Sequence, residues 1–411
     1  MNIVFLSHPL FLKSQSMPRF VAMLAEGMQH RGHTVEILRP ASFFSRIPVP
    51  SGMQKWLGYI DQFIIFPFRV RRRMRSLREK TLFVFTDHAL GPWVPLTSGV
   101  PNVIHCHDFL AQHSANRMIP QNPTRWSGRM YQRYIRSGYR KGLNFISVSE
   151  KTRTDLHSYL TRSPHSSTVV YNGLNRSFKP VDPSLARQVI SQRISLNVAS
   201  GYILHVGGNQ WYKNRIGVIE IYNKWRSSTA HTLPLLMIGR SPDKRLSSAY
   251  EQSPFKSDIF FIVDMEDQFL PAAYSGATVF LFPSIAEGFG WPVAEAMACA
   301  CPVITTNSMP MTEVAGEAAA LIPVQPFDKQ NTEQWACDCA EVLEDVVSMT
   351  PCERFAMVEA GQINANRFNT SGALDQIEKI YDAILNAREN GQDTNGLKES
   401  SLCPDSVAPN H

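Results

Sequence analysis

Short apolar runs alternate with longer amphipathic segments along the chain. The first run, residues 2–7, predicts a buried strand. Residues 16–29 follow with helical spacing, with Ser16 as the N-cap and Gly32 to end the helix, and residues 35–38 predict a second strand. Further apolar runs lie at 82–86, 103–106, 145–148 and 168–171. Such an alternation is typical of a parallel sheet covered by helices on both faces.

The same pattern starts again after a linker that contains Pro180 and Pro183. Residues 202–206 predict a strand that ends at Gly207, and residues 214–225 predict the helix after it. Further strands are expected near 235–238, 259–263, 279–282, 302–305 and 320–322. The sequence therefore predicts an α/β protein with two doubly wound, Rossmann-like parallel sheets, whose ligands bind beyond the carboxyl ends of the strands.

A length of 411 residues suits two domains. The expected boundaries are an N-terminal domain over residues 1–180 and a C-terminal domain over residues 181–370. Residues 371–389 carry apolar side chains at helical spacing and predict a helix that packs back on the first domain. Residues 390–411 are polar and rich in Gly, Ser, Pro and Asn, which predicts a disordered tail.

The charges divide unevenly between the two predicted domains. Residues 1–180 carry 25 Lys and Arg against 8 Asp and Glu, whereas the remainder carries 16 against 27. A basic half joined to an acidic half implies an anionic partner for the first. The seven cysteines form no Cys-x-x-Cys pair, and no apolar run is long enough to cross a bilayer. We therefore expect a cytoplasmic protein, and the N-terminal apolar run is a strand rather than a signal peptide.

The most informative stretch is the predicted strand–loop–helix after residue 279. Gly288 and Gly290 allow backbone N–H groups to approach a ligand closely, and the helix N-terminus behind them favours a phosphate. Glu287 leaves the loop at the carboxyl end of the strand, where it is placed to bind sugar hydroxyls. Glu295 is expected in the first helical turn, where a carboxylate is stabilised by the helix dipole and can bind a ribose. The alternative is that both carboxylates only cap local structure.

The whole run resembles the Glu-x7-Glu motif of the family-4 retaining glycosyltransferases. It is written here Pro-Ser-Ile-Ala-Glu-Gly-Phe-Gly, ending in Glu-Ala-Met-Ala, over residues 283–298. The similarity continues at 148–150, 171–173, 263–267, 301–304 and 311–314. The resemblance implies the GT-B fold, with a nucleotide-sugar donor in the C-terminal domain and an acceptor in the N-terminal domain. It also implies an enzyme that needs neither metal nor cofactor, with Phe289 beside the two glycines in the donor loop.

A glycine-rich turn after residue 206 supplies candidates for binding the donor diphosphate. Lys213 stands at a helix start, where similarity to the Lys-Asn pair of the family favours diphosphate binding over a solvated lysine. Many members of the family carry an arginine just after the first glycine, where this chain has Gly208. The residues expected around this diphosphate are Gly207, Gly208, Asn209, Lys213, Asn214 and Arg215.

Two segments of the first domain are candidates for the opposite wall of the site. His107 ends the run Val-Ile-His-Cys-His and matches the histidine of the family that faces the donor sugar; a structural histidine at a strand end is the alternative. His105, His107 and Asp108 also raise the possibility of a metal site, but His-x-His pairs on strands are common and we assign none. The first loop places Ser14, Ser16 and Met17 where a phosphate or acceptor binds, or where a simple N-cap forms.

Two clusters account for the basic character of the first domain. Arg125, Arg129, Arg133, Arg136 and Arg140 recur on one helical face. Six arginines between residues 69 and 78 follow the aromatic and apolar segment 56–68. An apolar patch beside clustered arginines predicts contact with an anionic membrane surface. Nucleic acid is the rival partner, but the chain contains no recognition module for it.

These observations predict a retaining, metal-independent glycosyltransferase that acts on a glycan or lipid-linked hydroxyl. Glu287, Lys213 and His107 are its candidate catalytic residues. A non-catalytic, membrane-associated protein that binds a sugar nucleotide or glycolipid is the main alternative. A GT-B-shaped epimerase or a phosphorylase that uses pyridoxal phosphate is a further one.

Overall fold

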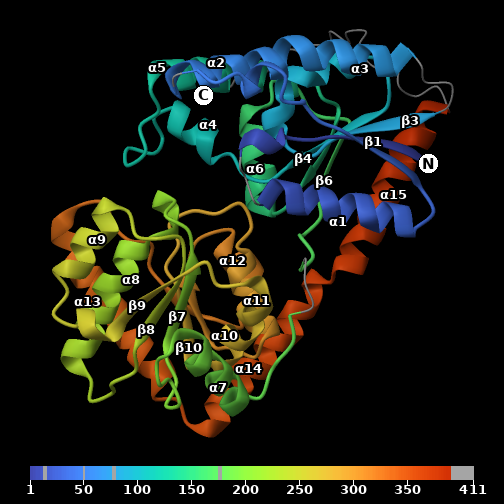
Figure 1. Cartoon of the computed structure of the whole chain (residues 1–411). Coiled ribbons are helices and arrows are strands. Elements are labelled where there is room, and N and C mark those ends of the chain that lie inside the picture. Colours follow the sequence, from blue (N-terminus) through green and yellow to red (C-terminus); the bar gives the residue numbers. More distant parts are fainter. Residues whose placement is uncertain (13–15, 50, 76–79, 175–177, 390–411) are drawn as a thin grey trace, which may run out of the picture.

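The computed structural model describes residues 1–12, 16–49, 51–75, 80–174 and 178–389. Over these residues the strands form two six-stranded parallel sheets, each with helices on both faces, and the two units lie one above the other in Figure 1. The predicted architecture of two doubly wound sheets is confirmed. Of the remaining predictions, the disordered tail at 390–411, Ser14, Arg78 and the side chain of Ser16 lie outside the described part of the chain.

The N-terminal sheet has the strand order β2-β1-β3-β4-β5-β6. In β1, Ile3 and Phe5 enter one apolar core while Val4 and Leu6 enter another, which explains the uninterrupted apolar run. The strands are β1 (Asn2–Leu6), β2 (Thr34–Leu38), β3 (Thr81–Phe85), β4 (Asn102–Cys106), β5 (Asn144–Ser147) and β6 (Ser166–Val169). The helices are η1 (Leu10–Leu12), α1 (Ser16–His30), η2 (Phe44–Arg46), α2 (Ser51–Ile60), η3 (Asp61–Ile65), α3 (Phe66–Arg75), η4 (His88–Thr97), α4 (Leu110–Ala115), α5 (Trp126–Tyr139) and α6 (Glu150–Tyr159).

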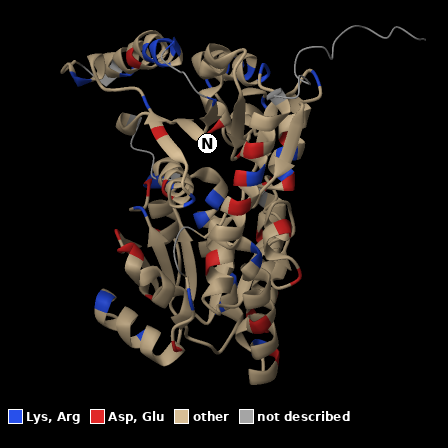
Figure 2. Ribbon diagram, turned by 90° about the vertical axis from the view of Figure 1, so that its right-hand side faces the viewer, with Lys and Arg blue, Asp and Glu red and all other residues tan. Residues whose placement is uncertain are grey.

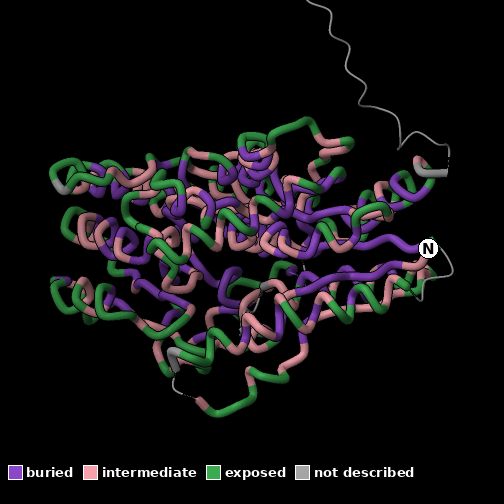
Figure 3. The backbone as a smooth tube through the Cα atoms, turned by 90° about the horizontal axis from the view of Figure 1, so that it is seen from above, coloured by how far each residue is buried: buried purple, intermediate pink, exposed green. Residues whose placement is uncertain are grey.

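The C-terminal sheet has the order β12-β11-β10-β7-β8-β9, so β10 and β7 are neighbours at its centre. Its strands are β7 (Ile203–Gly207), β8 (Leu235–Gly239), β9 (Ile259–Val263), β10 (Val279–Phe282), β11 (Val303–Thr306) and β12 (Ala320–Ile322). Its helices are α7 (Pro183–Ile194), η5 (Trp211–Lys213), α8 (Arg215–Ser228), α9 (Lys244–Glu251), η6 (Lys256–Asp258), η7 (Asp267–Phe269), α10 (Leu270–Gly276), α11 (Trp291–Ala298), α12 (Met311–Ala315), α13 (Lys329–Val347), α14 (Pro351–Ala365) and η8 (Asn366–Phe368). Figure 3 shows the buried strands between helices whose outer sides are exposed.

The segment from α2 to α3 runs on as helix through the π-helical turn η3, which the apolar pattern alone does not predict. Asp61 begins η3 and is 1% exposed. Its carboxylate accepts backbone hydrogen bonds from Phe43, Phe44 and Ser45 at 2.9–3.2 Å. Burial opposes ionisation of Asp61, but these donors outweigh it and lower its pKa. An apparent break in the apolar pattern is therefore an anchor for the preceding loop.

The last helix, α15 (Thr370–Glu389), leaves the C-terminal unit and lies beside α1 of the N-terminal unit (Figure 1). Leu374, Ile377 and Tyr381 are buried in the core on that face of the N-terminal sheet. Tyr381 also hydrogen-bonds the buried Nε2 of His105 at 2.8 Å. The helix therefore joins the two units through apolar packing.

Two buried histidines predict a loss of stability in acid. Burial lowers the pKa of His105 and of His205 to about 3, so both are neutral in the folded protein at pH 5. The unfolded chain binds one more proton at each between pH 3 and pH 6.5, so stability falls as pH decreases through that window, by about 1.4 kcal/mol per pH unit for each histidine. The midpoint of urea unfolding is measured at about pH 7.5 and at about pH 5. The difference between these two midpoints should be smaller in His205→Leu than in the wild type, and an equal difference in both proteins would contradict the role of His205.

Candidate active site

The loops after two neighbouring strands of the C-terminal sheet are joined directly. The backbone N–H of Ile285, after β10, donates to the carbonyl of Tyr212, after β7, at 2.8 Å. The hydroxyl of Ser284 donates to the same carbonyl at 2.8 Å. Asn214 adds a further link, because its Nδ2 donates to the carbonyl of Pro283 at 3.1 Å while its Oδ1 accepts from Gly217 at the start of α8. These bonds fix Lys213 opposite Glu287.

Lys213 and Glu287 form an ion pair with 2.7 Å between Nζ and Oε1. Their side chains are 15% and 9% exposed, so both charges are largely removed from water. Ser284 donates to the same carboxylate oxygen at 2.8 Å. The ammonium of Lys213 also lies 5.0 Å from the centre of the Phe282 ring. The sequence assigned these two residues to one site, and the structure places them in contact.

Gly288 lies against the backbone of the other unit. A Cβ at this position would stand 1.9 Å from the carbonyl oxygen of His107 and 3.0 Å from the Cβ of Asp108. The carbonyl of Gly288 accepts hydrogen bonds from the hydroxyls of Ser149 (2.7 Å) and Thr152 (3.2 Å) in the N-terminal unit. This glycine is therefore needed for contact between the two units, whereas the sequence suggested an approach of its backbone to a ligand.

A carboxylate of the C-terminal unit stabilises a helix end of the N-terminal unit. Glu313 of α12 accepts from the first backbone N–H groups of α6, those of Glu150 at 2.6 Å and Lys151 at 3.4 Å. These donors lack partners within the helix, and a carboxylate there also meets the positive end of the helix dipole. Arg19 and Asp267 add an ion pair between the units at 2.9 Å. The Glu287 loop and His107 are thus held face to face.

His107 lies at the carboxyl end of β4 and is half-buried. Its Nε2 is 2.9 Å from the carbonyl of Thr86, which can only accept, so Nε2 carries the proton and Nδ1 is the acceptor in the neutral ring. The ring of Phe20 packs edge-on at 4.4 Å. Burial lowers the pKa of His107 against the opposing effect of Asp87, which favours the neutral form.

Three residues beside His107 were missed by the sequence analysis. Asp87 accepts from Nε2 of His8 at 2.9 Å and lies 2.9 Å from Nδ1 of His88. Burial opposes ionisation of Asp87, yet the two histidines hold its pKa well below its usual range. His8 follows β1 and Asp87 follows β3, so both stand at carboxyl ends of strands. That position is the signal that would have found them.

Asp108 adds a carboxylate on the same side of the N-terminal sheet. Burial raises the pKa of Asp108. The negative charges of Asp87 and Glu287 also raise it, whereas His88 lowers it. Its Oδ1 accepts from the N–H of Leu110 at the start of α4 at 3.0 Å. The Cβ position of Gly288 is 3.0 Å from the Cβ of Asp108, so Asp108 meets the Glu287 loop across the boundary between the units.

Glu295 does not lie in the first turn of the helix, where the sequence predicted it. Helix α11 begins at Trp291, so Glu295 is its fifth residue and the first turn contains no acidic residue. Pro292 is the second residue of the helix and not the first, so each later residue lies one position further along the helix than the sequence suggested. Oε2 of Glu295 accepts a hydrogen bond from the buried hydroxyl of Tyr274 at 2.9 Å. Tyr274 therefore contributes to orienting this carboxylate.

The ring of Phe289 is buried beneath the loop between β10 and α11. Its ring is 3% exposed and packs against the rings of Phe368 and Tyr171. Gly290 has a φ of 104°, which a side chain rarely adopts, and a Cβ there would meet Met311 at 2.4 Å. Both residues therefore shape the turn from β10 into α11.

Arg215 is buried at the start of α8, with 5% of its surface exposed. Its Nη1 donates to Oδ1 of Asn209 and, at 2.8 Å, to the carbonyl of Arg240. Burial lowers its pKa to about 10, and among the described residues its Nε and Nη2 have no hydrogen-bond partner. The cation therefore lies beside the glycine turn that contains Gly207 and Gly208. An extra Cβ on Gly208 would have the end of the flexible Gln210 side chain as its nearest neighbour.

The segment of Ser14, Ser16 and Met17, which the sequence suggested for a phosphate or acceptor, is described only in part. Met17 is half-buried and packs against the apolar core that includes Phe20 and Leu24. Ser14 and the side chain of Ser16 are not among the described residues, so their role stays a prediction. Within the described ranges no group of three or more His, Cys, Asp or Glu side chains is arranged to hold a metal ion.

The two units each match a known protein family. Residues 17–178 match the family described as Glycosyltransferase Family 4, and residues 187–350 match Glycosyl transferases group 1. The chain belongs to the family-4-type glycosyltransferases. Its two facing parallel sheets are the GT-B fold of this family.

Curated relatives of the family match over limited lengths. O-antigen chain mannosyltransferase B of Escherichia coli is 33% identical over 130 residues, which is 31% of this chain and 34% of that protein. D-inositol 3-phosphate glycosyltransferase of Corynebacterium aurimucosum is 22% identical over 302 residues, 69% of this chain and 66% of that protein. The chain thus spans about a third of the length of the first of these relatives.

Solved structures of GT-B proteins superpose over nearly the whole chain. Sucrose-phosphate synthase from Thermosynechococcus elongatus has a TM-score of 0.70 at 16% identity and covers 94% of this chain and 100% of its own. HepE of Anabaena, solved in complex with UDP and glucose, has a TM-score of 0.66 at 15% identity and covers 93% of this chain and 100% of its own. At these identities the likeness concerns the fold alone.

Proposed function

We propose that this chain transfers a sugar from a nucleoside-diphosphate sugar to a hydroxyl of a glycan or lipid-linked acceptor, with retention of anomeric configuration and without a metal. The observation that carries the proposal is the Lys213–Glu287 pair at 2.7 Å, which lies at strand ends of one sheet. The next residue in the same loop, Gly288, lies against the His107 backbone of the other unit. A fixed cation and an adjacent carboxylate suit a ligand with a diphosphate at one end and hydroxyls at the other.

Each residue has a role that its contacts support. Lys213 meets the negative charge that develops on the leaving phosphate, and Arg215 adds a second cation beside the glycine turn. Glu287, once its partner Lys213 binds phosphate, accepts hydrogen bonds from hydroxyls of the sugar. His107 offers the acceptor Nδ1 from the opposite wall, and Glu295 binds the ribose in the orientation set by Tyr274.

Retention follows when departure and attack share one face of the sugar. The bond from the anomeric carbon to the phosphate oxygen breaks, and the bond to the acceptor oxygen forms on the same side. The departing phosphate takes the acceptor proton, so no side-chain base is required. The contacts of Gly288 with Ser149 and Thr152 close the units around this step and limit access of water, which would hydrolyse the donor.

Release of nucleoside diphosphate tests this proposal against its alternatives. The protein is incubated with a panel of UDP-, GDP- and ADP-sugars and a mixture of glycan and lipid-linked acceptors, in the presence of a metal chelator. Acceptor-dependent release is expected with one donor of the panel. Donor binding without release would instead indicate a non-catalytic binding protein, conversion of the donor sugar an epimerase, and dependence on inorganic phosphate a phosphorylase.

We further propose that the protein works at the cytoplasmic face of an anionic membrane. Helices α2 and α5 pack together through Tyr59 and Tyr131, whose ring centres are 5.7 Å apart. Large apolar side chains stay exposed beside them, with Trp126 at 75% and Trp56 at 67%. Figure 2 shows Lys and Arg on the helices at this end of the N-terminal unit. No described helix is long and apolar enough to cross a bilayer, and this basic, aromatic surface suits adsorption instead.

Binding to vesicles tests the surface of α2 and α5. We expect the protein to sediment with vesicles that contain phosphatidylserine and to be released as salt rises, because exposed charges are screened. The double change Trp56→Ser/Trp126→Ser should weaken binding about ten-fold, since two exposed apolar anchors are lost. Phe355→Ser removes a ring that is 67% exposed on α14 and should have no effect. Equal losses in both variants would contradict this assignment.

A further inference from the structure

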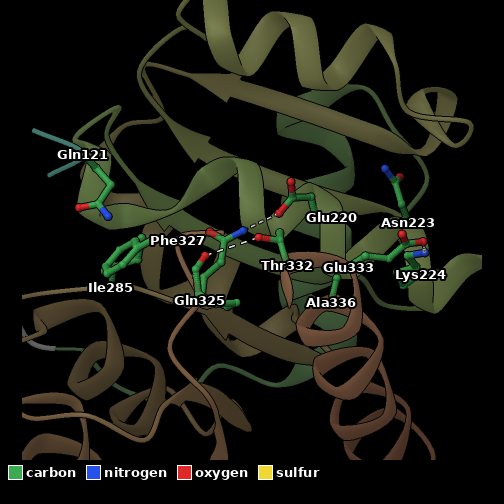
Figure 4. A pocket seen from close by; sticks show the side chains of 11 residues that line it. Gln121, Glu220, Asn223, Lys224, Ile285, Gln325, Phe327, Thr332, Glu333 and Ala336 are labelled. Atoms are coloured by element: carbon green, nitrogen blue, oxygen red, sulfur yellow. Dashed lines mark hydrogen bonds and ion pairs between the residues drawn. The ribbon is translucent and has the colours of Figure 1, made fainter. Parts of the chain in front are cut away.

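A cavity of about 560 Å³ lies beside the donor loop, between α8 and the start of α13. Gln121 reaches it from the N-terminal unit, in the segment between α4 and α5, and Ile285 reaches it from the donor loop. In Figure 4 the side chains that line it form a row from Gln121 and Phe327, through Gln325 and Glu220, to Asn223 and Lys224. Its volume is within the range of small-molecule sites, about 300–1,000 Å³.

Amide, hydroxyl and carboxylate groups alternate along this row. Nε2 of Gln325 donates to Oε2 of Glu220 at 2.7 Å, which fixes both side chains. Burial raises the pKa of Glu220 against the effect of this bond. The hydroxyl of Thr332 and the amide of Asn223 also line the cavity, and Ser253 holds Oδ1 of Asn223 at 2.6 Å. Fixed donors and acceptors side by side suit a ligand with many hydroxyls.

The charges of the lining oppose an anionic ligand. Glu220 and Glu333 are the carboxylates of the lining, and its one ammonium, Lys224, pairs with Glu333 at 2.5 Å. A phosphate, a nucleotide or an acidic sugar would therefore meet net negative charge. Phe327 lines the cavity with 65% of its surface exposed, so its ring is accessible to the apolar side of a sugar.

The cavity continues toward the donor site. A second cavity, of about 280 Å³, shares Gln121, Ile285 and Gln325 with the first and extends to Trp211 and Arg215. Ile285 is two residues from Glu287 in the same loop. A chain that enters at the far end of the first cavity therefore reaches the neighbourhood of Lys213 and Glu287.

We propose that this cavity binds a neutral oligosaccharide stretch of the acceptor, behind the sugar that receives the transfer. The proposal rests on the proposed function, because it assigns the cavity to the acceptor of that reaction. It makes the enzyme prefer longer acceptors, with Phe327 as a stacking platform and Glu220 and Gln325 as hydrogen-bonding groups.

Acceptor-length kinetics test this site in the intact chain. The ratio of kcat/KM for a neutral tetrasaccharide to that for the monosaccharide should exceed one and fall about ten-fold in Phe327→Ala, a typical loss for a single good contact. Glu220→Gln should lower the ratio less, because it keeps the shape and one acceptor oxygen. The control Phe355→Ala, at the matched exposure of 67%, should leave the ratio unchanged. No length preference, or an equal loss in the control, would overturn the proposal.

A binding measurement separates failure of the site from failure of the proposed function. The methyl group of Ala336 lines only the first of the two cavities and reports on it by NMR without turnover. α-Mannotetraose, maltotetraose and cellotetraose are each added at about 10 mM, the range of weak single-site affinities. We expect at least one to shift this resonance in the wild type and to require about ten-fold more sugar for the same shift in Phe327→Ala. No shift with any of them, or a shift with inorganic phosphate alone, would overturn the site even if transfer is observed.

Discussion

Glu287→Gln is expected to lower sugar transfer by about 10²–10³-fold while the protein still binds nucleoside diphosphate at least as tightly as the wild type. In the absence of donor, the Glu287 carboxylate holds the ammonium of Lys213 at 2.7 Å. A diphosphate must compete with that carboxylate for the cation. Removing the negative charge therefore frees Lys213 for phosphate, while the sugar loses the acceptor for its hydroxyls.

Lys213→Met should lower both nucleoside diphosphate binding and sugar transfer. A charge-assisted contact to phosphate contributes about 1.5–3 kcal/mol, so nucleoside diphosphate affinity should fall roughly 10–100-fold together with transfer. Calorimetric titration with the diphosphate of the active donor, beside a transfer assay, measures the two effects separately. Lys256→Met provides the control, because it breaks an exposed Lys–Glu pair of 2.9 Å just before the amino end of β9, whereas the site lies at carboxyl ends of strands; it should change neither quantity.

The most specific part of this prediction is that Glu287→Gln and Lys213→Met differ in nucleoside diphosphate binding, which only Lys213→Met should weaken. A structural role for the pair would make both variants lose stability and binding together, because each leaves a partner that is largely buried without its counter-charge. Thermal unfolding of the two variants shows whether the fold is intact. Weaker diphosphate binding in Glu287→Gln than in Lys213→Met would contradict the assigned roles.

Gly288→Ala is expected to abolish transfer almost completely without unfolding either unit. The new Cβ would stand 1.9 Å from the carbonyl oxygen of His107, which is backbone and cannot move aside alone. The units must then separate, and the hydroxyls of Ser149 and Thr152 lose their bonds to Gly288. Displacement of reacting groups by about 1 Å costs on the order of 10²-fold in rate.

Gly372→Ala is the matched control for this change. It lies in α15, and a Cβ there meets no atom within 4 Å, so the variant should transfer as the wild type does and be slightly more stable. Small-angle scattering should report a larger radius of gyration for Gly288→Ala than for the wild type. Transfer at the wild-type rate in Gly288→Ala would show that closure of the units does not matter for the reaction.

The strands and the strand–loop–helix around Glu287 were predictable because they depend on local pattern. Buried parallel strands such as β1 and β10 are continuous apolar runs, and their carboxyl ends are where ligands bind. The Lys213–Glu287 contact required only that β7 and β10 be neighbours, which is the usual central pair of such a sheet. The family resemblance indicated which residue types to look for, and the family matches confirm the family itself.

What could not be predicted depends on contacts between distant segments. The contact of Gly288 between the units is one such feature, because its Cβ position is closed by the backbone of His107, far away in the chain. His8, Asp87 and His107 come together only because β1, β3 and β4 lie side by side in the sheet. Predicting the position of Glu295 required the exact start of α11, because a small shift in a helix boundary changes the turn on which a side chain lies.

The anomeric configuration of the first product is the most direct test of the central claim, that Lys213 and Glu287 hold a donor whose sugar is transferred with retention. The reaction is run with the active donor of known configuration, and the product is read by NMR at its anomeric carbon before any further reaction. We expect the configuration of the donor in the wild type, and in Glu287→Gln the product should form about 10²–10³-fold more slowly. An inverted product, or the same product formed at the wild-type rate by Glu287→Gln, would contradict the account.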